Sequence, residues 1–254
     1  MKNPTKLKRL APWLDTLAIA LWGILLLKYW LTGKLNILIH PAYHWLCIVG
    51  GFGLLVVCGL KFSDLWRRGK HAAEPQAMLS HVTLFPPGWS TTFLLVAAIA
   101  GLMFTPRPFA SQTALQTGVS DILTATRSQP RSFRNSKNPE ERSILDWVRT
   151  LNVYPEPDAY TGQQVNVSGF VLHPPDFPEN YTILSRFVIT CCAADAYPIG
   201  LPVKLPPDSK KYPADTWLQV RGTMATEKLL DRRKLVIQAR AIAEIPEPKN
   251  PYAY

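Results

Sequence analysis

Two adjacent cysteines and a nearby aspartate are the residues of this chain best suited to chemistry. Cys191 and Cys192 stand side by side, and Asp195 follows within the same short segment. Thiolates and carboxylates are ligands of first-row metals such as zinc. The three side chains could therefore supply part of a metal site, or a reactive thiol. The thioredoxin-type exchange motif is absent, because the spacing is not Cys-x-x-Cys.

Two other interpretations of the cysteine pair stay open. Both thiols could be inert, since free cysteine is among the most buried residue types. They could also form a vicinal disulfide, which requires a strained ring. Because neighbouring side chains of a strand point to opposite faces, we expect Cys191 on the core side and Cys192 on the other. Both sulfurs can then reach one ion only if the strand ends or kinks at this pair.

Two histidines form a second candidate site. His40 and His44 lie four residues apart in the segment HPAYH. His40 before Pro41 is typical of a helix N-cap followed by the first helical residue. The imidazoles could hold a metal or a proton, or could simply face lipid headgroups. We expect His40 to be the additional ligand of a metal bound by the cysteine pair.

The elements that must position the cysteines form a β domain. Apolar residues recur with a period of two from Gln163 onward. Five short strands in about 85 residues suit an OB-like barrel. A helix over Glu140–Asn152, begun by Asn138 and Pro139, should pack on this domain. The expected strands cover residues 163–171, 181–192, 199–205, 216–224 and 234–245.

The N-terminal part of the chain is apolar enough for a membrane. Three runs, Leu10–Leu31, Tyr43–Phe62 and Trp89–Phe104, approach the roughly 20 residues that cross a bilayer. The glycines of the second run allow close helix packing. We therefore expect a three-span transmembrane region over residues 1–104. A tether over 105–137, with a short helix near 119–127, should lead to the β domain with its leading helix at 138–254.

Charge orients these spans. The chain has 28 Lys+Arg against 18 Asp+Glu, and residues 1–104 carry most of the excess. Basic residues gather in the N-terminal tail and in the loop before the third run, which places both in the cytoplasm. Three crossings then put the C-terminal domain of this multi-pass cell-membrane protein outside the cytoplasm. That compartment and the near-balanced charge of residues 105–254 exclude a nucleic-acid partner, whereas the lipid bilayer is an expected one.

Several segments together resemble a known family. RFVITCCAADAYPIGLPV, an IHPAYHWL-type segment, VNVSGFV, TWLQVRGTM and the PYAY end are similar to the YcgQ-like family of two-component membrane permease subunits. The resemblance covers nearly the whole chain. It implies a polytopic YcgR-type permease as partner and a role in the homeostasis of metal, zinc in particular. The matching motif positions are His40, Pro41, Arg186, Cys191, Cys192, Asp195 and Ala196.

The function expected from these features is that of an accessory subunit of a permease complex, not of an enzyme. It would present or sense a zinc-like metal outside the membrane through Cys191, Cys192, Asp195 and His40. One alternative is a non-catalytic assembly or gating platform with packed cysteines. Another is a vicinal-thiol oxidoreductase.

Overall fold

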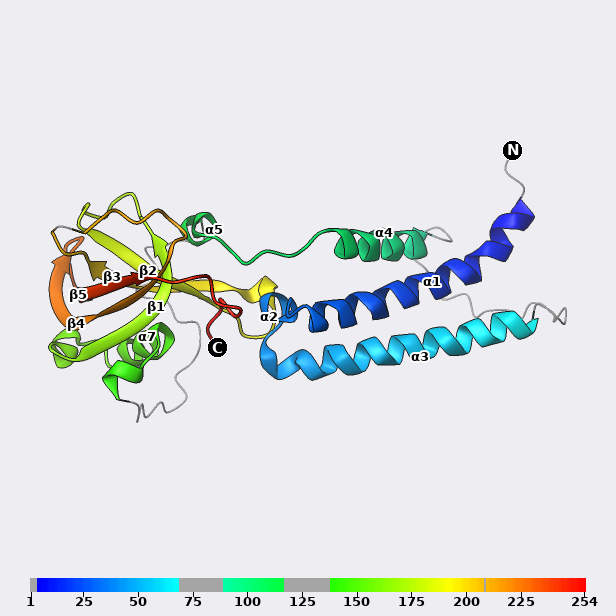
Figure 1. Cartoon of the computed structure of the whole chain (residues 1–254), viewed down its shortest axis with the longest axis horizontal. Coiled ribbons are helices and arrows are strands. Elements are labelled where there is room, and N and C mark those ends of the chain that lie inside the picture. The colour runs from blue at the N-terminus through cyan, green and yellow to red at the C-terminus, as the bar shows by residue number, and fades with distance from the viewer. Residues whose placement is uncertain (1–3, 69–88, 117–137, 208) are drawn as a thin grey trace. The chain divides into compact units, whose positions relative to one another are not determined.

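The computed structural model describes residues 4–68, 89–116, 138–207 and 209–254. The chain divides into two compact units, Met1–Arg107 and Pro108–Tyr254. Figure 1 shows that the long helices belong to the first unit and the strands to the second. The short helix expected near 119–127 lies outside the described residues.

Two helices of the N-terminal unit are long and apolar enough to cross a membrane, over Leu10–Leu31 and Pro41–Arg67. They point to membrane association, whereas the orientation stays a prediction. The third expected span is a helix of 15 residues, about 22 Å long, against a bilayer core of roughly 30 Å. Two of the three expected spans are therefore candidates by length and composition, whereas the third apolar run, which has prolines close to both of its ends in the sequence, forms a helix too short to qualify. The helices are α1 (Pro4–Leu31), α2 (Leu35–Leu38), η1 (Pro41–Tyr43), α3 (His44–Arg68) and α4 (Trp89–Met103).

Helix α1 contacts both of the other long helices of this unit. Gly51 of α3 lies against Leu27 of α1, where a Cβ atom would approach the Leu27 side chain to 3.0 Å. Helix α4 follows α1 in the same direction. Near the start of α4, the Thr91 hydroxyl donates a hydrogen bond to the Asp15 carboxylate of α1 at 2.5 Å. Near its end, the Gly101 carbonyl accepts one from the Tyr29 hydroxyl of α1 at 2.6 Å.

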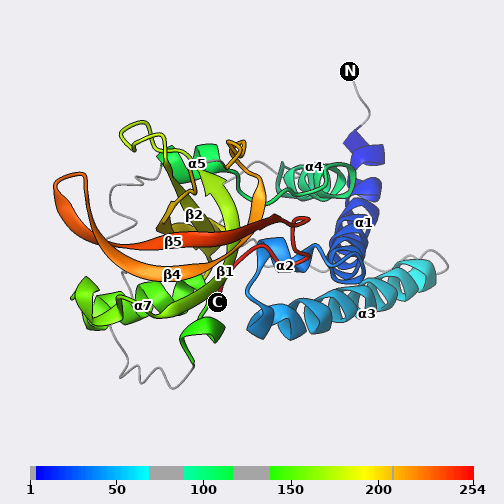
Figure 2. The same ribbon diagram turned by 60° about the vertical axis from the view of Figure 1, so that its left-hand side comes forward.

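The C-terminal unit is a closed five-stranded barrel in the order β1-β2-β3-β5-β4. Neighbouring strands are antiparallel except β3 and β5, which are parallel. Figure 2 shows the long strands β4 and β5 curving side by side. The prediction of five strands is confirmed. Their bounds are β1 (Gln164–Leu172), β2 (Tyr181–Val188), β3 (Tyr197–Lys204), β4 (Trp217–Leu229) and β5 (Arg232–Glu244).

The barrel core follows the alternation seen in the sequence. Val165, Val167 and Val171 of β1 are buried in one cluster with residues of every other strand and of helix α7 (Ile144–Val153). Trp147 of α7 is fully buried there. The expected leading helix is split in two, because Ser143 and Asp146 form a capping box that begins α7 after a separate turn, η2 (Pro139–Glu141).

A second, aromatic cluster covers the barrel wall on the side opposite to this core. Phe170 and Phe187 stack with ring centroids 5.7 Å apart, and Trp217 lies edge-on to Phe170 at 5.9 Å. Phe109, which precedes helix α5 (Ser111–Gln116), and Tyr252 near the C-terminus both contact Phe187, at 5.3 and 6.5 Å. The two ends of the unit thus cover the outer face of β1 and β2.

Candidate functional site

The cysteine pair lies in a loop, not in a strand. Strand β2 ends at Val188, and the single turn η4 (Ala193–Asp195) follows the pair. The prediction that the strand continues to Cys192 is wrong. The Asp195 carboxylate takes the place of a neighbouring strand, since its oxygens accept hydrogen bonds from the backbone N–H of Thr190 at 3.1 Å and of Cys191 at 2.8 Å. Local side-chain bonding of this kind competes with strand pairing.

Both sulfurs are free thiols with Sγ atoms 3.7 Å apart. Cys191 is exposed and Cys192 is half-buried, so the prediction that Cys191 faces the core is wrong, because the alternation of β2 stops before it. Two sulfurs bound to one tetrahedral zinc at about 2.3 Å would lie about 3.8 Å apart. The thiol pair therefore has the spacing of two ligands of one ion.

Asp195 also determines the protonation of the Cys191 thiol. A hydrogen bond to Asp195, together with the neighbouring Cys192 thiol, raises the pKa of Cys191 to about 11. Partial burial works to raise the pKa of Asp195, but the hydrogen bonds from the Cys191 and Thr190 amides hold it below its ordinary value. Cys191 is thus a neutral thiol at neutral pH, and a metal must displace its proton to bind.

The loop supplies two sulfurs rather than a complete metal centre. Within the described ranges, no group of three or more His, Cys, Asp and Glu side chains is placed to hold an ion. Asp195 directs its oxygens at backbone amides, so its expected role as a ligand stays a prediction. An ion on the thiol pair would keep positions open for other ligands.

The histidines lie at the start of the long apolar helix α3. The Nδ1 atom of His40 accepts a hydrogen bond from the Ala42 N–H at 3.1 Å, which confirms the predicted N-cap. The Nε2 atom of His44 lies 3.0 Å from the Ile39 carbonyl oxygen. Both histidines belong to the N-terminal unit and the cysteines to the C-terminal one. His40 as an additional metal ligand stays a prediction.

Arg186, on β2 before the pair, ties two strands together. Its guanidinium donates from Nε to the Ser168 carbonyl at 3.0 Å and from Nη2 to the Ser168 hydroxyl at 3.1 Å. It also lies over the Trp217 ring, 5.3 Å from the centroid. Burial lowers the pKa of Arg186. These contacts join β2 to β1 and β4 close to the cysteine loop.

The C-terminal residues form a support that the sequence did not reveal. Ala253 pairs in parallel with Val188, donating its N–H to the Phe187 carbonyl at 2.8 Å and accepting from the Ile189 N–H at 3.4 Å. Tyr252 is buried beside them. The chain end therefore extends the sheet at the point where β2 leads into the cysteine loop.

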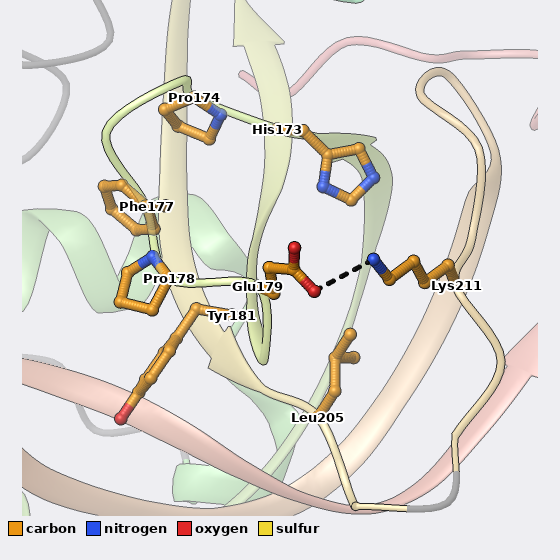
Figure 3. Close-up of a pocket in the computed structure, with 8 residues that line it drawn as sticks. All are labelled: His173, Pro174, Phe177, Pro178, Glu179, Tyr181, Leu205 and Lys211. Carbon is orange, nitrogen blue, oxygen red and sulfur yellow. Dashed lines mark hydrogen bonds and ion pairs between the residues drawn. The ribbon is translucent and has the colours of Figure 1, made fainter.

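A separate pocket of about 250 Å³ lies on loops of the barrel. Figure 3 shows Lys211 reaching Glu179, an ion pair of 3.1 Å, with the His173 ring nearby. Nε2 of His173 is bonded to the Tyr212 carbonyl at 2.8 Å. No motif marks this pocket, because its walls come from loops before β2 and after β3. They are formed by His173, Pro174, Phe177, Pro178, Glu179, Tyr181, Leu205 and Lys211.

The fold and the site define a chain with two long apolar helices followed by a barrel that carries an exposed thiol pair. Residues 139–254 match the family described as the DUF1980 C-terminal domain. The matched residues include the whole barrel, the cysteine loop and the C-terminal tail. No curated protein matches the chain.

Proposed function

We propose that this chain is the accessory subunit of a membrane permease complex, and that its barrel presents a soft metal ion, with zinc as the model, on Cys191 and Cys192 outside the cytoplasm. The observation that carries the proposal is the pair of free sulfurs 3.7 Å apart in a loop open to solvent. This spacing suits two ligands of one tetrahedral ion. The permease itself is the polytopic partner that the YcgQ-like resemblance implies.

The small number of protein ligands supports a site that presents a metal ion to a partner rather than a structural metal site. Structural zinc sites are closed by four protein ligands. Here Cys191 is exposed and Cys192 is half-buried, and Asp195 is occupied with the amides that shape the loop. An ion held by two sulfurs keeps coordination positions for a partner and can be passed on.

The barrel topology supports an OB-like assignment for this domain. Its strand order places β5 between β3 and β4, and the contact between β3 and β5 is the parallel one. A five-stranded Greek-key barrel of this kind presents its loops for binding. The cysteine loop is the connection between β2 and β3.

The contacts of α4 support a third crossing despite its length. The end of a helix inside a bilayer needs partners for its last carbonyl groups. Lys28 and Tyr29 of α1 provide them, donating to the carbonyls of Leu102 at 2.7 Å and Gly101 at 2.6 Å. A helix parallel to α1 is also what a third alternating span requires. This arrangement would carry the chain to the side opposite its N-terminus.

The charged side chains within the apolar helices support the proposal that transport requires a partner protein. Asp15 and Lys28 of α1 each bond to α4. Ionisable residues of membrane helices often line transport pathways, but these two are engaged in holding the helices together. We infer that selective transport requires a second, polytopic protein.

Zinc titration of the reduced full-length protein in detergent, against a chromophoric chelator, tests the metal site. We expect one ion per chain, and a loss of affinity of about a hundredfold or more in both Cys191→Ser and Cys192→Ser. Cys47→Ser is the matched control and should bind zinc as the wild type does. If the wild type binds no more tightly than the double variant of the pair, the metal proposal fails and the platform alternative replaces it.

A further inference from the structure

We propose that Cys191 and Cys192 form a reversible vicinal disulfide that switches the thiol pair off. The regulation of metal presentation rests on the proposed function, whereas the disulfide itself rests only on the geometry of the two thiols. The two sulfurs are 3.7 Å apart and must close to about 2.05 Å to bond. The modification site is therefore complete within one loop of the chain.

The loop leaves the pair free to make this movement. The two residues lie outside the strands, between the end of β2 at Val188 and the turn η4. The backbone of Cys192 is extended, with φ −154° and ψ 171°. The carboxylate of Asp195 holds the backbone amides of Thr190 and Cys191, and Cys192 makes a single β-bridge rather than a run of strand pairing. Exposure of Cys191 admits an external oxidant.

No other cysteine of the C-terminal unit competes for the pair. The remaining two cysteines of the chain, Cys47 and Cys58, belong to α3 in the N-terminal unit. The Sγ atom of Cys58 there donates to the Thr16 carbonyl at 3.7 Å. Within the unit that holds them, Cys191 and Cys192 can form an intramolecular disulfide only with each other.

The oxidant is a small-molecule disulfide. The thiolate of one cysteine attacks it, forms a mixed disulfide and releases the first small thiol. The thiolate of the other cysteine then attacks the protein sulfur of the mixed disulfide, forms the Cys191–Cys192 bond and releases the second small thiol. The protein loses two S–H bonds, and its two electrons and two protons leave with the two small thiols.

The bond is labile because its geometry is strained. Cα atoms of adjacent residues lie about 3.8 Å apart, below the range of about 4.4–6.8 Å in ordinary disulfides. Strained, exposed disulfides are the easily reduced, regulatory ones. Oxidation also removes the proton that Cys191 donates to Asp195, and it removes both thiolates that a metal requires. The oxidised loop is therefore the metal-free state of the switch.

The test incubates the reduced full-length protein in detergent with mixtures of reduced and oxidised glutathione. Samples are quenched in acid and labelled with maleimide, and the peptide with the pair is analysed by mass. We expect a peptide lacking two hydrogens, about a tenfold loss of labelling, and full recovery when reduced glutathione is restored. Cys191→Ser and Cys192→Ser are the controls, and each should stop at a mixed disulfide with glutathione.

The inference is overturned if the wild type also stops at a mixed disulfide, carries two glutathiones, or keeps both thiols open to maleimide throughout. Zinc titration of the reduced protein separates this result from the proposed function. Zinc binding without the disulfide overturns the switch alone. Disulfide formation without zinc binding supports the switch and overturns the metal site.

Discussion

Asp195 accounts for both the shape of the cysteine loop and the state of its thiols. One carboxylate binds the amides of Thr190 and Cys191, and the same group accepts a hydrogen bond from the Cys191 thiol. An acceptor with negative charge favours the protonated thiol. The exposed Cys191 thiol is therefore protonated at neutral pH, and in that form it is a weak nucleophile.

Replacing the carboxylate should activate Cys191. In Asp195→Asn the pKa of Cys191 should fall from about 11 toward its ordinary value. A fall of about two units gives roughly a hundredfold more thiolate, and the lower nucleophilicity of that thiolate removes roughly tenfold of the gain. Alkylation of Cys191 by iodoacetamide at pH 8, followed by peptide mass, should be roughly tenfold faster.

Asp176→Asn is the matched control, because Asp176 is exposed on a loop of the same unit and should not alter the rate. An unchanged rate in Asp195→Asn would mean that this carboxylate does not determine the protonation of the Cys191 thiol.

The sequence shows the residue types of the candidate site but not their contacts. The adjacent cysteines and a nearby carboxylate are visible as residue types, and so is His40 as a helix cap. That Asp195 faces amides, and that Ala253 pairs beside Val188, depends on long-range folding. No periodicity encodes these contacts, since each involves only one or two residues of an irregular segment.

At the scale of elements, the outer aromatic cluster joins both ends of the C-terminal unit to the barrel. Phe109 contacts Phe187 and Tyr252, with ring centroids 5.3 and 6.2 Å apart. Ser111 at the start of α5 adds a hydrogen bond from its hydroxyl to Asp215 at 3.0 Å. The chain that leaves the N-terminal unit is thus fixed to the strand that leads to the cysteine loop.

Phe109→Ala should loosen this attachment without destroying the barrel core. Truncation of a half-buried ring should cost about 1–2 kcal/mol of local stability, which corresponds to about five- to thirtyfold faster amide exchange in α5. Hydrogen exchange followed by mass spectrometry measures this rate. Phe177→Ala removes a half-exposed ring from the pocket and should leave α5 unaffected. Equal rates of amide exchange in α5 for the wild type and Phe109→Ala would show that the aromatic contact does not stabilise this helix.

The apolar pattern of the sequence predicted the existence of the strands better than the residues at which they end. Short apolar segments in the sequence predicted all five strands, and each strand contributes residues to the core, although β2 and β3 are buried on both faces and do not alternate. The end of β2 at Val188 was missed, since the residues after it are as compatible with a strand as those before. The closed order of the barrel depends on pairings between distant strands, and a local pattern carries no information about them.

At the scale of the whole molecule, the number of crossings decides where the thiol pair is exposed. Two spans return the chain to the side of its N-terminus, whereas three place the barrel on the other side. Helix α4 is therefore the decisive element, and its bonds to Asp15, Lys28 and Tyr29 are what supports the proposal that it is a third span. Hydrophobic length alone would have favoured two crossings.

Labelling of intact cells with a membrane-impermeant maleimide tests the central claim most directly. After mild reduction, the peptide that holds Cys191 and Cys192 should be labelled without permeabilisation, because the proposed three-span topology places the exposed Cys191 thiol outside the cytoplasm. Cys191→Ser combined with Cys192→Ser should abolish that label, which assigns it to the pair. Labelling of the pair only after the membrane has been permeabilised would contradict the account, since the thiols would then face the cytoplasm and could present no ion outside it.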